Sequence, residues 1–170
     1  MKLTGGGLVM LVMGVDPGTA RTGYGLVRPA GGRLQAIAHG TIETSSKLPP
    51  AERLAVIHRR LAGLVEQHRP AVVAVEEVFF GANARSAMAV GQARGAALLA
   101  AVLGGAAVAE YTPFQVKQAV TGYGRADKGQ VRFMVKSLLG LKEIPFHDDV
   151  TDALATAICC LHRWRGEAWA

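Results

Sequence analysis

An apolar run that ends on a single aspartate and a glycine-containing turn constrains the fold of this chain more than any other stretch. Residues 8–15 are almost wholly apolar, which is typical of a β-strand buried on both faces. Asp16 closes the run, where a carboxylate is costly unless it is paired or binds a cation. Pro17 and Gly18 then form a turn, and residues 24–27 predict a return strand, so Asp16 lies near the centre of a hairpin. This stretch alone leaves two roles open for Asp16, metal binding and turn initiation.

The composition limits the class of protein. With 170 residues, half of them hydrophobic, the chain fits one globular domain, expected at residues 8–170 after a disordered extension at residues 1–7. The formal net charge of +6 favours a polyanionic partner, and nucleic acid is a better candidate than an acidic membrane surface.

Two features favour a cytoplasmic protein. Cys159 and Cys160 are the only cysteines, and their adjacent positions on a predicted helix suit a structural disulfide poorly. The apolar start has no small-residue cleavage site and is needed for the sheet, so we expect no signal peptide. Translation can begin at Met1, Met10 or Met13, since the first strand needs little before them.

Strands and helices alternate along the rest of the chain. A third strand at residues 34–44 follows a Gly31-Gly32 turn, which gives a meander of sequential strands. The helical spacing of apolar residues predicts an amphipathic helix between Pro50 and Pro70. The later predicted elements are strands at residues 71–75 and 106–111, a long helix at residues 84–103, and helices that begin at Pro113, Lys128 and Asp148.

Acidic residues recur where these predicted elements begin or end. Glu76 closes the second buried strand as Asp16 closes the first, and two such strand ends can place both carboxylates on one side of a sheet. Asp149 and Asp152 open the last helix three positions apart and therefore share one face. Acids in a first helical turn also complement the helix dipole, so capping explains one or two of them. Because residues 153–160 are almost wholly apolar, this helix is expected to be buried with its acids facing inward or into a cleft.

A shared cation site explains Asp16, Glu76, Asp149 and Asp152 better than four separate structural roles. Clustered carboxylates without histidine or cysteine ligands suit a hard ion such as Mg²⁺ or Mn²⁺. Combined with a basic chain, such a site predicts phosphodiester hydrolysis by two metal ions about 4 Å apart, one activating water and one stabilising the leaving oxygen.

Several residues are candidate nucleic-acid contacts. Phe79 and Phe80 follow the Glu76 strand and can stack on exposed bases, each stack contributing about 1 to 3 kcal/mol, although core packing explains at least one of them equally well. Lys117 and Lys128 are candidate phosphate contacts, with solvated lysines as the alternative. The further DNA-binding candidates are Arg85, Tyr123 and Arg125.

The long helix at residues 84–103 carries Gly91 and Gly95 four positions apart, so one face is bare and can approach another backbone closely. Contact with the chain's own sheet is the expected use of this face, and contact with a second subunit is the alternative. Gln92 and Arg94 interrupt the helix and argue against a membrane span.

Five motifs in order resemble the RuvC family of bacterial Holliday junction resolvases, and the match covers nearly everything after Leu8. They are GVDPG at residues 14–18, AVEEVF at 74–79, GQARG at 91–95, QVKQ at 115–118 and DVTDAL at 149–154. The resemblance implies an α/β, RNase H-like fold: a five-stranded mixed sheet, its first three strands antiparallel, with helices on both faces. It also implies a structure-specific endonuclease in DNA recombination and repair, a homodimer that nicks two strands of like polarity at a four-way DNA junction.

The resemblance also carries site residues and partners. It matches Asp16, Glu76, Asp149 and Asp152 to the four catalytic carboxylates, Lys117 and Lys128 to lysines near the scissile phosphate, and Phe79 to the aromatic residue at the junction centre. It implies two Mg²⁺ ions per subunit, with Mn²⁺ as a substitute, and the RuvA–RuvB branch-migration complex as a partner. Some relatives have a histidine as the first residue of the last acidic pair, whereas this chain has Asp149, with His147 outside the motif.

Two other functional classes are compatible with parts of the pattern. An actin-like or sugar-kinase ATPase also starts with an aspartate and glycine hairpin, but it needs two such lobes and this chain supplies one. A non-catalytic junction-binding or RNA-processing relative of the same fold has no use for four carboxylates. ATP turnover, and cleavage of a four-way junction compared with a linear duplex, distinguish these classes.

Overall fold

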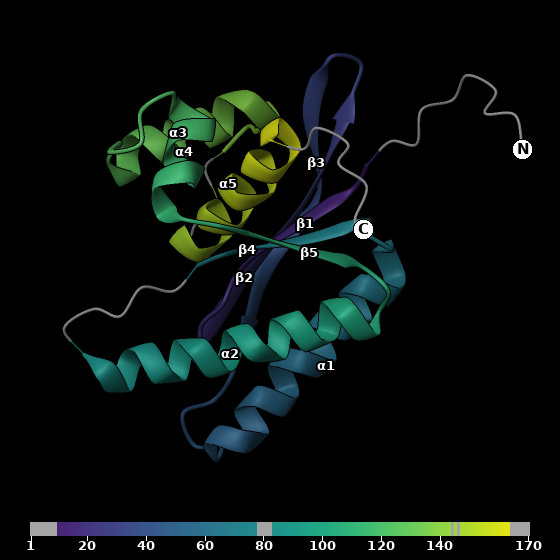
Figure 1. The fold of residues 1–170 in the computed structure, drawn as a ribbon, viewed down its shortest axis with the longest axis vertical. Coiled ribbons are helices and arrows are strands. Elements are labelled where there is room, and N and C mark those ends of the chain that lie inside the picture. Colours follow the sequence, from purple (N-terminus) through teal and green to yellow (C-terminus); the bar gives the residue numbers. More distant parts are fainter. Residues whose placement is uncertain (1–9, 78–82, 144, 146, 164–170) are drawn as a thin grey trace, which may run out of the picture.

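The computed structural model describes residues 10–77, 83–143, 145 and 147–163, so the predicted extension at residues 1–7 lies outside it. A five-stranded sheet in the order β3-β2-β1-β4-β5 forms the centre (Figure 1). The strands are β1 (Val12–Asp16), β2 (Arg21–Ala30), β3 (Arg33–Glu43), β4 (Val72–Glu76) and β5 (Ala107–Tyr111). The helices are α1 (Pro50–His68), α2 (Ala84–Leu103), α3 (Pro113–Thr121), α4 (Lys128–Leu139) and α5 (Asp148–Arg163).

The sheet is mixed. Strands β1, β2 and β3 form an antiparallel meander, and β4 then pairs parallel with β1 and β5 parallel with β4. The β2–β3 turn contains Gly31 and Gly32 at φ angles of +57° and +77°, a region that glycine adopts at little steric cost. The predicted meander and mixed sheet are confirmed, and the fold is RNase H-like.

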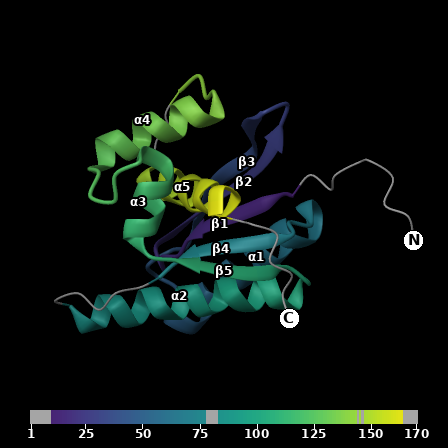
Figure 2. The ribbon, with the colours of Figure 1, turned by 45° about the horizontal axis from the view of Figure 1, so that its top comes forward.

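Helices cover both faces of the sheet. One hydrophobic core joins α1 and α2 to one face, and a second core joins α3, α4 and α5 to the other. Figure 2 shows α2 on one side of the sheet and α3, α4 and α5 on the opposite side. Because strand side chains alternate between faces, Val15 and Val75 belong to the α1–α2 core whereas Ala74 belongs to the α5 core.

Helix α5 lies directly on the backbone of β1 and β2, where three glycines make room for it. Gly14 and Gly25 are paired across the two strands, and Gly23 lies two residues before Gly25. A Cβ atom on Gly14 would overlap the carbonyl of Ala153, and one on Gly23 would overlap the backbone of Asp149. We call Gly14, Gly23 and Gly25 the glycine patch; it sets how closely the start of α5 approaches the sheet.

The predicted use of the glycine face of α2 is wrong. Helix α2 packs on the chain's own core through alanines, with Ala93, Ala97 and Ala100 almost fully buried. Nothing lies within 4 Å of the positions where Cβ atoms would stand on Gly91 and Gly95. Alanine provides both a small side chain and apolar area, so the helix buries its alanine face and leaves its glycine face open.

Among the described residues, α2 is the one helix long and apolar enough to cross a membrane, a test that core helices of globular proteins also pass. Here it packs on the sheet through its buried alanines, and the guanidinium of Arg94 lies 2.6 Å from the carboxylate of Glu110 in β5. This ion pair joins the middle of α2 to the sheet.

Candidate active site

The two predicted strand-end acids lie at neighbouring strand ends. Strands β1 and β4 run parallel, with Val15 opposite Val75, and Asp16 and Glu76 are the next residues of each strand. Both valines face the α1–α2 core, so alternation directs the two carboxylates to the face that α5 covers. The predicted placement of Asp16 and Glu76 on one side of the sheet is confirmed.

The other two predicted acids reach the same place from α5. Asp149 and Asp152 lie in the first turns of this helix, and the backbone of Asp149 rests on Gly23, the residue paired with Asp16 across the β1–β2 ladder. Figure 1 shows α5 running beside β1, the strand that it contacts. The helix start is thereby fixed above the end of β1.

The turn after Asp16 has its own hydrogen bonds. The backbone N–H of Gly18 donates to the hydroxyl of Thr22 (3.3 Å), and that hydroxyl donates to the carbonyl of Gly18 (2.7 Å). A threonine that closes the turn makes the turn-initiating role of Asp16 unnecessary.

The close grouping of the acids changes their proton affinities. Burial raises the pKa of Asp16 to about 8, and repulsion from Asp152, Asp149 and Glu76 adds to the increase. Burial, followed by repulsion from Asp152, raises the pKa of Glu76 to about 7. Burial also raises the pKa of Asp152. Without a cation, this carboxylate cluster therefore retains protons near neutral pH, and a divalent ion that replaces those protons relieves the repulsion.

Two predicted lysines lie beside the cluster. Although burial dominates the pKa of Glu76, the charge of Lys117 on α3 acts in the opposite direction and lowers it. Lys128, at the start of α4, likewise opposes the rise in the pKa values of Asp16 and Asp152 that burial causes. Its ammonium also lies 3.8 Å from a carboxylate oxygen of Asp148. The structure therefore brings both lysines within electrostatic reach of the carboxylates.

Helix caps fix the positions of these lysines. At the start of α3, the Thr112 hydroxyl accepts from the backbone N–H of Gln115, whose side chain accepts from the backbone of Thr112. Asp127 and Gln130 make the same reciprocal pair at the start of α4. Such capping boxes fix where a helix begins, and so where Lys117 and Lys128 are placed.

The donor set fits a hard cation by its chemistry. In the part of the chain that the structure describes, no three His, Cys, Asp or Glu side chains are arranged so that they could hold a metal ion. The four acids nonetheless interact electrostatically at one site and are all oxygen donors, which Mg²⁺ and Mn²⁺ prefer.

Arg21, which no sequence motif singled out, lies on β2 beside the cluster. Its Nη1 atom lies 3.5 Å from Oδ2 of Asp149, and its Nε atom donates to Oε1 of Glu43 at 3.1 Å. The His147 Nε2 atom lies 3.9 Å from the same Glu43 oxygen. The β2–β3 hairpin pairs Arg21 with Glu43, but the register shift between Leu26 and Val27 means that counting from the hairpin turn would not find this pair.

The remaining predicted DNA-binding residues are dispersed. Phe79 and Phe80 lie outside the described residues. Tyr123, 59% exposed, and Arg125, also exposed, belong to the loop between α3 and α4. Arg85 is exposed in the first turn of α2, a helix on the opposite face of the sheet from α5. The structure thus does not place Arg85 on the carboxylate face.

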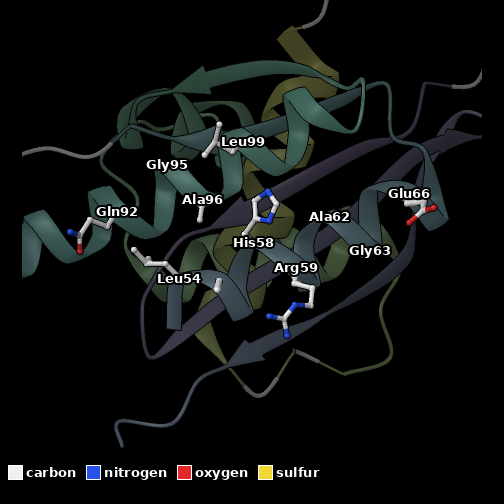
Figure 3. A pocket seen from close by; sticks show the side chains of 11 residues that line it. Leu54, His58, Arg59, Ala62, Gly63, Glu66, Gln92, Gly95, Ala96 and Leu99 are labelled. Atoms are coloured by element: carbon white, nitrogen blue, oxygen red, sulfur yellow. The ribbon is translucent and has the colours of Figure 1, made fainter. Parts of the chain in front are cut away.

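A separate groove of about 930 Å³ lies between α1 and α2 (Figure 3). Leu54 and His58 border it from α1, and Gln92, Gly95 and Leu99 border it from α2. It contains none of the four acids and lies on the face opposite α5.

Sequence comparisons identify the family that this chain resembles. The family model described as crossover junction endodeoxyribonuclease RuvC matches residues 12–160. A protein of that name from Pelotomaculum thermopropionicum is 55% identical over 158 residues, covering 93% of this chain and 96% of its own. One from Syntrophomonas wolfei is 52% identical over 156 residues, covering 92% and 91%.

Solved RuvC structures also resemble this chain over most of its length. Thermus thermophilus RuvC has a TM-score of 0.83 and 40% identity, covering 90% of this chain and 94% of its own. T. thermophilus RuvC in complex with Holliday junction substrate has a TM-score of 0.86 and 41% identity, covering 90% and 93%. The yeast mitochondrial resolvase Ydc2, with a TM-score of 0.68 at 12% identity and coverage of 91% and 80%, shares the fold.

Proposed function

The chain belongs to the RuvC family of crossover junction endodeoxyribonucleases, and we propose that the carboxylate cluster is the metal site of its nuclease activity. Its function is the endonucleolytic resolution of four-way Holliday junctions in DNA recombination and repair, and the family is metal-dependent. The assignment of this chemistry to Asp16, Glu76, Asp149 and Asp152 rests on one observation. Three acids from β4 and α5 act together on Asp16 and help raise its pKa to about 8, an arrangement that a bound divalent cation would stabilise.

The residues divide into two charge groups. The four carboxylates release their protons and supply oxygen ligands, for which we propose two Mg²⁺ ions per subunit, with Mn²⁺ as a substitute. When bound, such ions supply an activated water near neutral pH and stabilise the leaving oxygen. Lys117 and Lys128 lie on the α3 and α4 side of the cluster, where their ammonium groups can hold the oxygens of the scissile phosphate.

We assign further DNA contacts to the segment after β4 and to the α3–α4 loop. Phe79 and Phe80 follow Glu76 closely in sequence, which suits stacking on bases opened at the junction centre. Tyr123 and Arg125 are exposed on the loop that precedes Lys128. Arg85 remains a proposed backbone contact, reached by DNA that extends past the start of α2.

Paired nicks in two strands require two active sites, so we propose a symmetric homodimer formed through α2. The open positions at Gly91 and Gly95 allow close helix approach, and Leu99 and Leu103 are 57% and 76% exposed on the same helix. The groove between α1 and α2 can receive apolar side chains of the partner (Figure 3). Sedimentation tests this proposal: Leu99→Glu should convert the dimer to monomers, and an unchanged sedimentation coefficient would contradict it.

The remaining proposals concern the cellular compartment and the protein partner. Free, buried Cys159 and Cys160 fit a reducing cytoplasm. A RuvA–RuvB branch-migration complex is the proposed partner on the junction, and we propose no membrane association. Both proposals follow from the family membership.

A cleavage assay with a synthetic mobile four-way junction and Mg²⁺ tests the proposed function. We expect paired nicks in strands of like polarity, no cleavage of a linear duplex of matched sequence, and no cleavage in EDTA. ATP hydrolysis without junction cleavage would instead support a phosphate-binding ATPase. Junction binding without cleavage in either Mg²⁺ or Mn²⁺ would indicate a non-catalytic relative.

A further inference from the structure

Arg21 connects the carboxylate cluster to the outer hairpin of the sheet. Its guanidinium reaches Asp149 of α5 with Nη1 and Glu43 of β3 with Nε, at 3.5 and 3.1 Å. One planar group therefore bridges two acids whose positions differ by more than a hundred residues in sequence. Glu43 is the more exposed acid, at 60%, and Asp149 the less exposed, at 33%.

The backbone predetermines this bridge. Arg21 and Glu43 are directly paired across β2 and β3, so the sheet register fixes the Arg21–Glu43 contact. Just beyond the pair, the backbone N–H of Thr44 donates to the carbonyl of Ala20 (3.1 Å). Asp149 in turn is held by the contact of its backbone with Gly23, two residues after Arg21. Each partner of Arg21 is thus positioned independently of the ion pair itself.

A carboxylate that binds a cation through one oxygen leaves its other oxygen free, and the carboxylate plane then rotates unless a donor holds that second oxygen. Ligand carboxylates in metal sites are themselves hydrogen-bonded for this reason, and loss of such a partner costs about 10- to 100-fold in metal affinity or activity. The rigid fork of a guanidinium suits this task better than a flexible ammonium.

We propose that Arg21, oriented by Glu43, is a positioning residue that holds Oδ2 of Asp149 and so presents the other oxygen, Oδ1, to the catalytic cation. The proposal rests on the proposed function of the carboxylate cluster. Arg21 touches neither the substrate nor the ion and acts through Asp149 alone.

If Arg21 acted only through its charge, its removal would change cation affinity in the direction opposite to that expected from positioning. A positive charge beside a cation site weakens cation binding, so removal of that charge alone would strengthen it. Removal of the Glu43 charge would weaken binding under either account, whereas Arg21→Lys keeps the positive charge, so electrostatics alone predicts little change for that variant. The sign of the change in affinity therefore separates positioning from charge.

Electron paramagnetic resonance measures Mn²⁺ binding to the DNA-free protein. The measurement is made on the oligomeric state that sedimentation shows. Arg21→Gln should weaken binding by about 10-fold, and Arg21→Lys by less, because one ammonium cannot bridge both acids in the same geometry. Glu43→Gln should also weaken binding, and the double variant Arg21→Gln/Glu43→Gln should be no weaker than Arg21→Gln, since Glu43 acts through Arg21. Excess Mg²⁺ should restore junction cleavage by Arg21→Gln.

Arg28→Gln is the matched control. Arg28 lies on the same strand and donates to Gln35 of β3 at 3.3 and 3.1 Å, so its replacement removes the same charge from the same hairpin. The Mn²⁺ affinity of the Arg28→Gln variant should equal that of the unmodified protein.

Equal or tighter Mn²⁺ binding by Arg21→Gln, or fully additive losses in the double variant, would overturn the proposal. If Arg21→Gln does not fold, Arg21→Lys supplies the comparison, because it keeps the charge and only the positioning account predicts weaker Mn²⁺ binding; unchanged binding by Arg21→Lys would then overturn the proposal. Failure of the unmodified protein to bind Mn²⁺ or cleave junctions would refute the proposed function itself. Equal Mn²⁺ binding by the unmodified protein and by Arg21→Gln would refute only the role of Arg21.

Discussion

Asp16 at the end of β1 combines burial with three acidic neighbours, and its pKa of about 8 has a direct consequence for folding. The ordinary value for this group is 3.8, so between about pH 4 and pH 8 the folded metal-free protein binds a proton that the unfolded chain has released. In that window the stability of the metal-free protein falls as the pH rises. This cost is a physical reason why the cluster needs a cation.

The variant Asp16→Asn should therefore be more stable than the unmodified protein in EDTA at pH 8, by roughly 0.5 to 2 kcal/mol, the range of single stabilising substitutions. The advantage should shrink toward pH 4, because below the ordinary pKa of 3.8 the aspartate is protonated in both the folded and the unfolded state. Urea unfolding in EDTA at both pH values measures the difference. A variant less stable than the unmodified protein at pH 8 would mean that the carboxylate has a structural partner.

At the scale of elements, the packing of α5 on the glycine patch determines where Asp149 and Asp152 lie. A Cβ atom on Gly14 would meet the backbone of Ala153, which cannot rotate away as a side chain can. The helix would have to lift from the sheet at its first turns, and the carboxylates would move with it.

Gly14→Ala should accordingly destabilise the protein by roughly 1 to 3 kcal/mol through overpacking and should reduce Mg²⁺-dependent cleavage. Gly63→Ala is the control, since Gly63 lies in α1 with open space at its Cβ position and alanine favours helices by up to about 1 kcal/mol. Chemical denaturation of both variants measures the effect on stability, and a nicking assay of Gly14→Ala against the unmodified protein measures the effect on cleavage; Gly63→Ala is a control for stability only, because Gly63 borders the groove between α1 and α2. Equal stability of Gly14→Ala and the unmodified protein would show that α5 can shift without cost.

Much of the fold could be predicted from the sequence because its signals are local. The helix predicted between Pro50 and Pro70 spans Pro50–His68, and the final helix begins at Asp148 as expected. The Arg21–Asp149 contact could not be predicted in this way. A register shift between Leu26 and Val27 changes which β3 residue faces Arg21, and the approach of α5 depends on tertiary packing. The expected contact of the glycine face of α2 with the sheet is wrong, because spacing shows that one face of a helix is bare but not which face is buried.

At the scale of the whole molecule, a basic chain surrounds an acidic centre. The formal net charge is +6 although four acids gather at the ends of β1 and β4 and the start of α5, so positive charge is in excess outside the carboxylate cluster, including Lys117 and Lys128 beside it. Cations on the surface attract the DNA backbone, whereas the acids repel it until metal ions neutralise them. Binding and cleavage therefore depend on opposite charges.

Junction affinity should fall steeply with salt, because lysine and arginine contacts to phosphates release counterions from the DNA. A titration between about 50 and 200 mM salt, in EDTA to prevent cleavage, measures the slope. Lys117→Gln should reduce the slope by about one phosphate contact, while Arg33→Gln, on the far end of the β2–β3 hairpin, serves as a charge-matched comparison. A flat salt response would rule out phosphate contacts as the main source of affinity.

The variant Asp152→Asn tests the central claim most directly, because it keeps the side-chain shape and removes one charge from the carboxylate cluster. The formal net charge becomes 6 + 1 = +7, so junction affinity in EDTA at pH 8 should equal or exceed that of the unmodified protein. Nicking of the same junction in Mg²⁺ should be lost. Gel shift in EDTA and nicking in Mg²⁺ on one preparation of each protein give the answer, and cleavage by the variant at a near-normal rate would contradict the account.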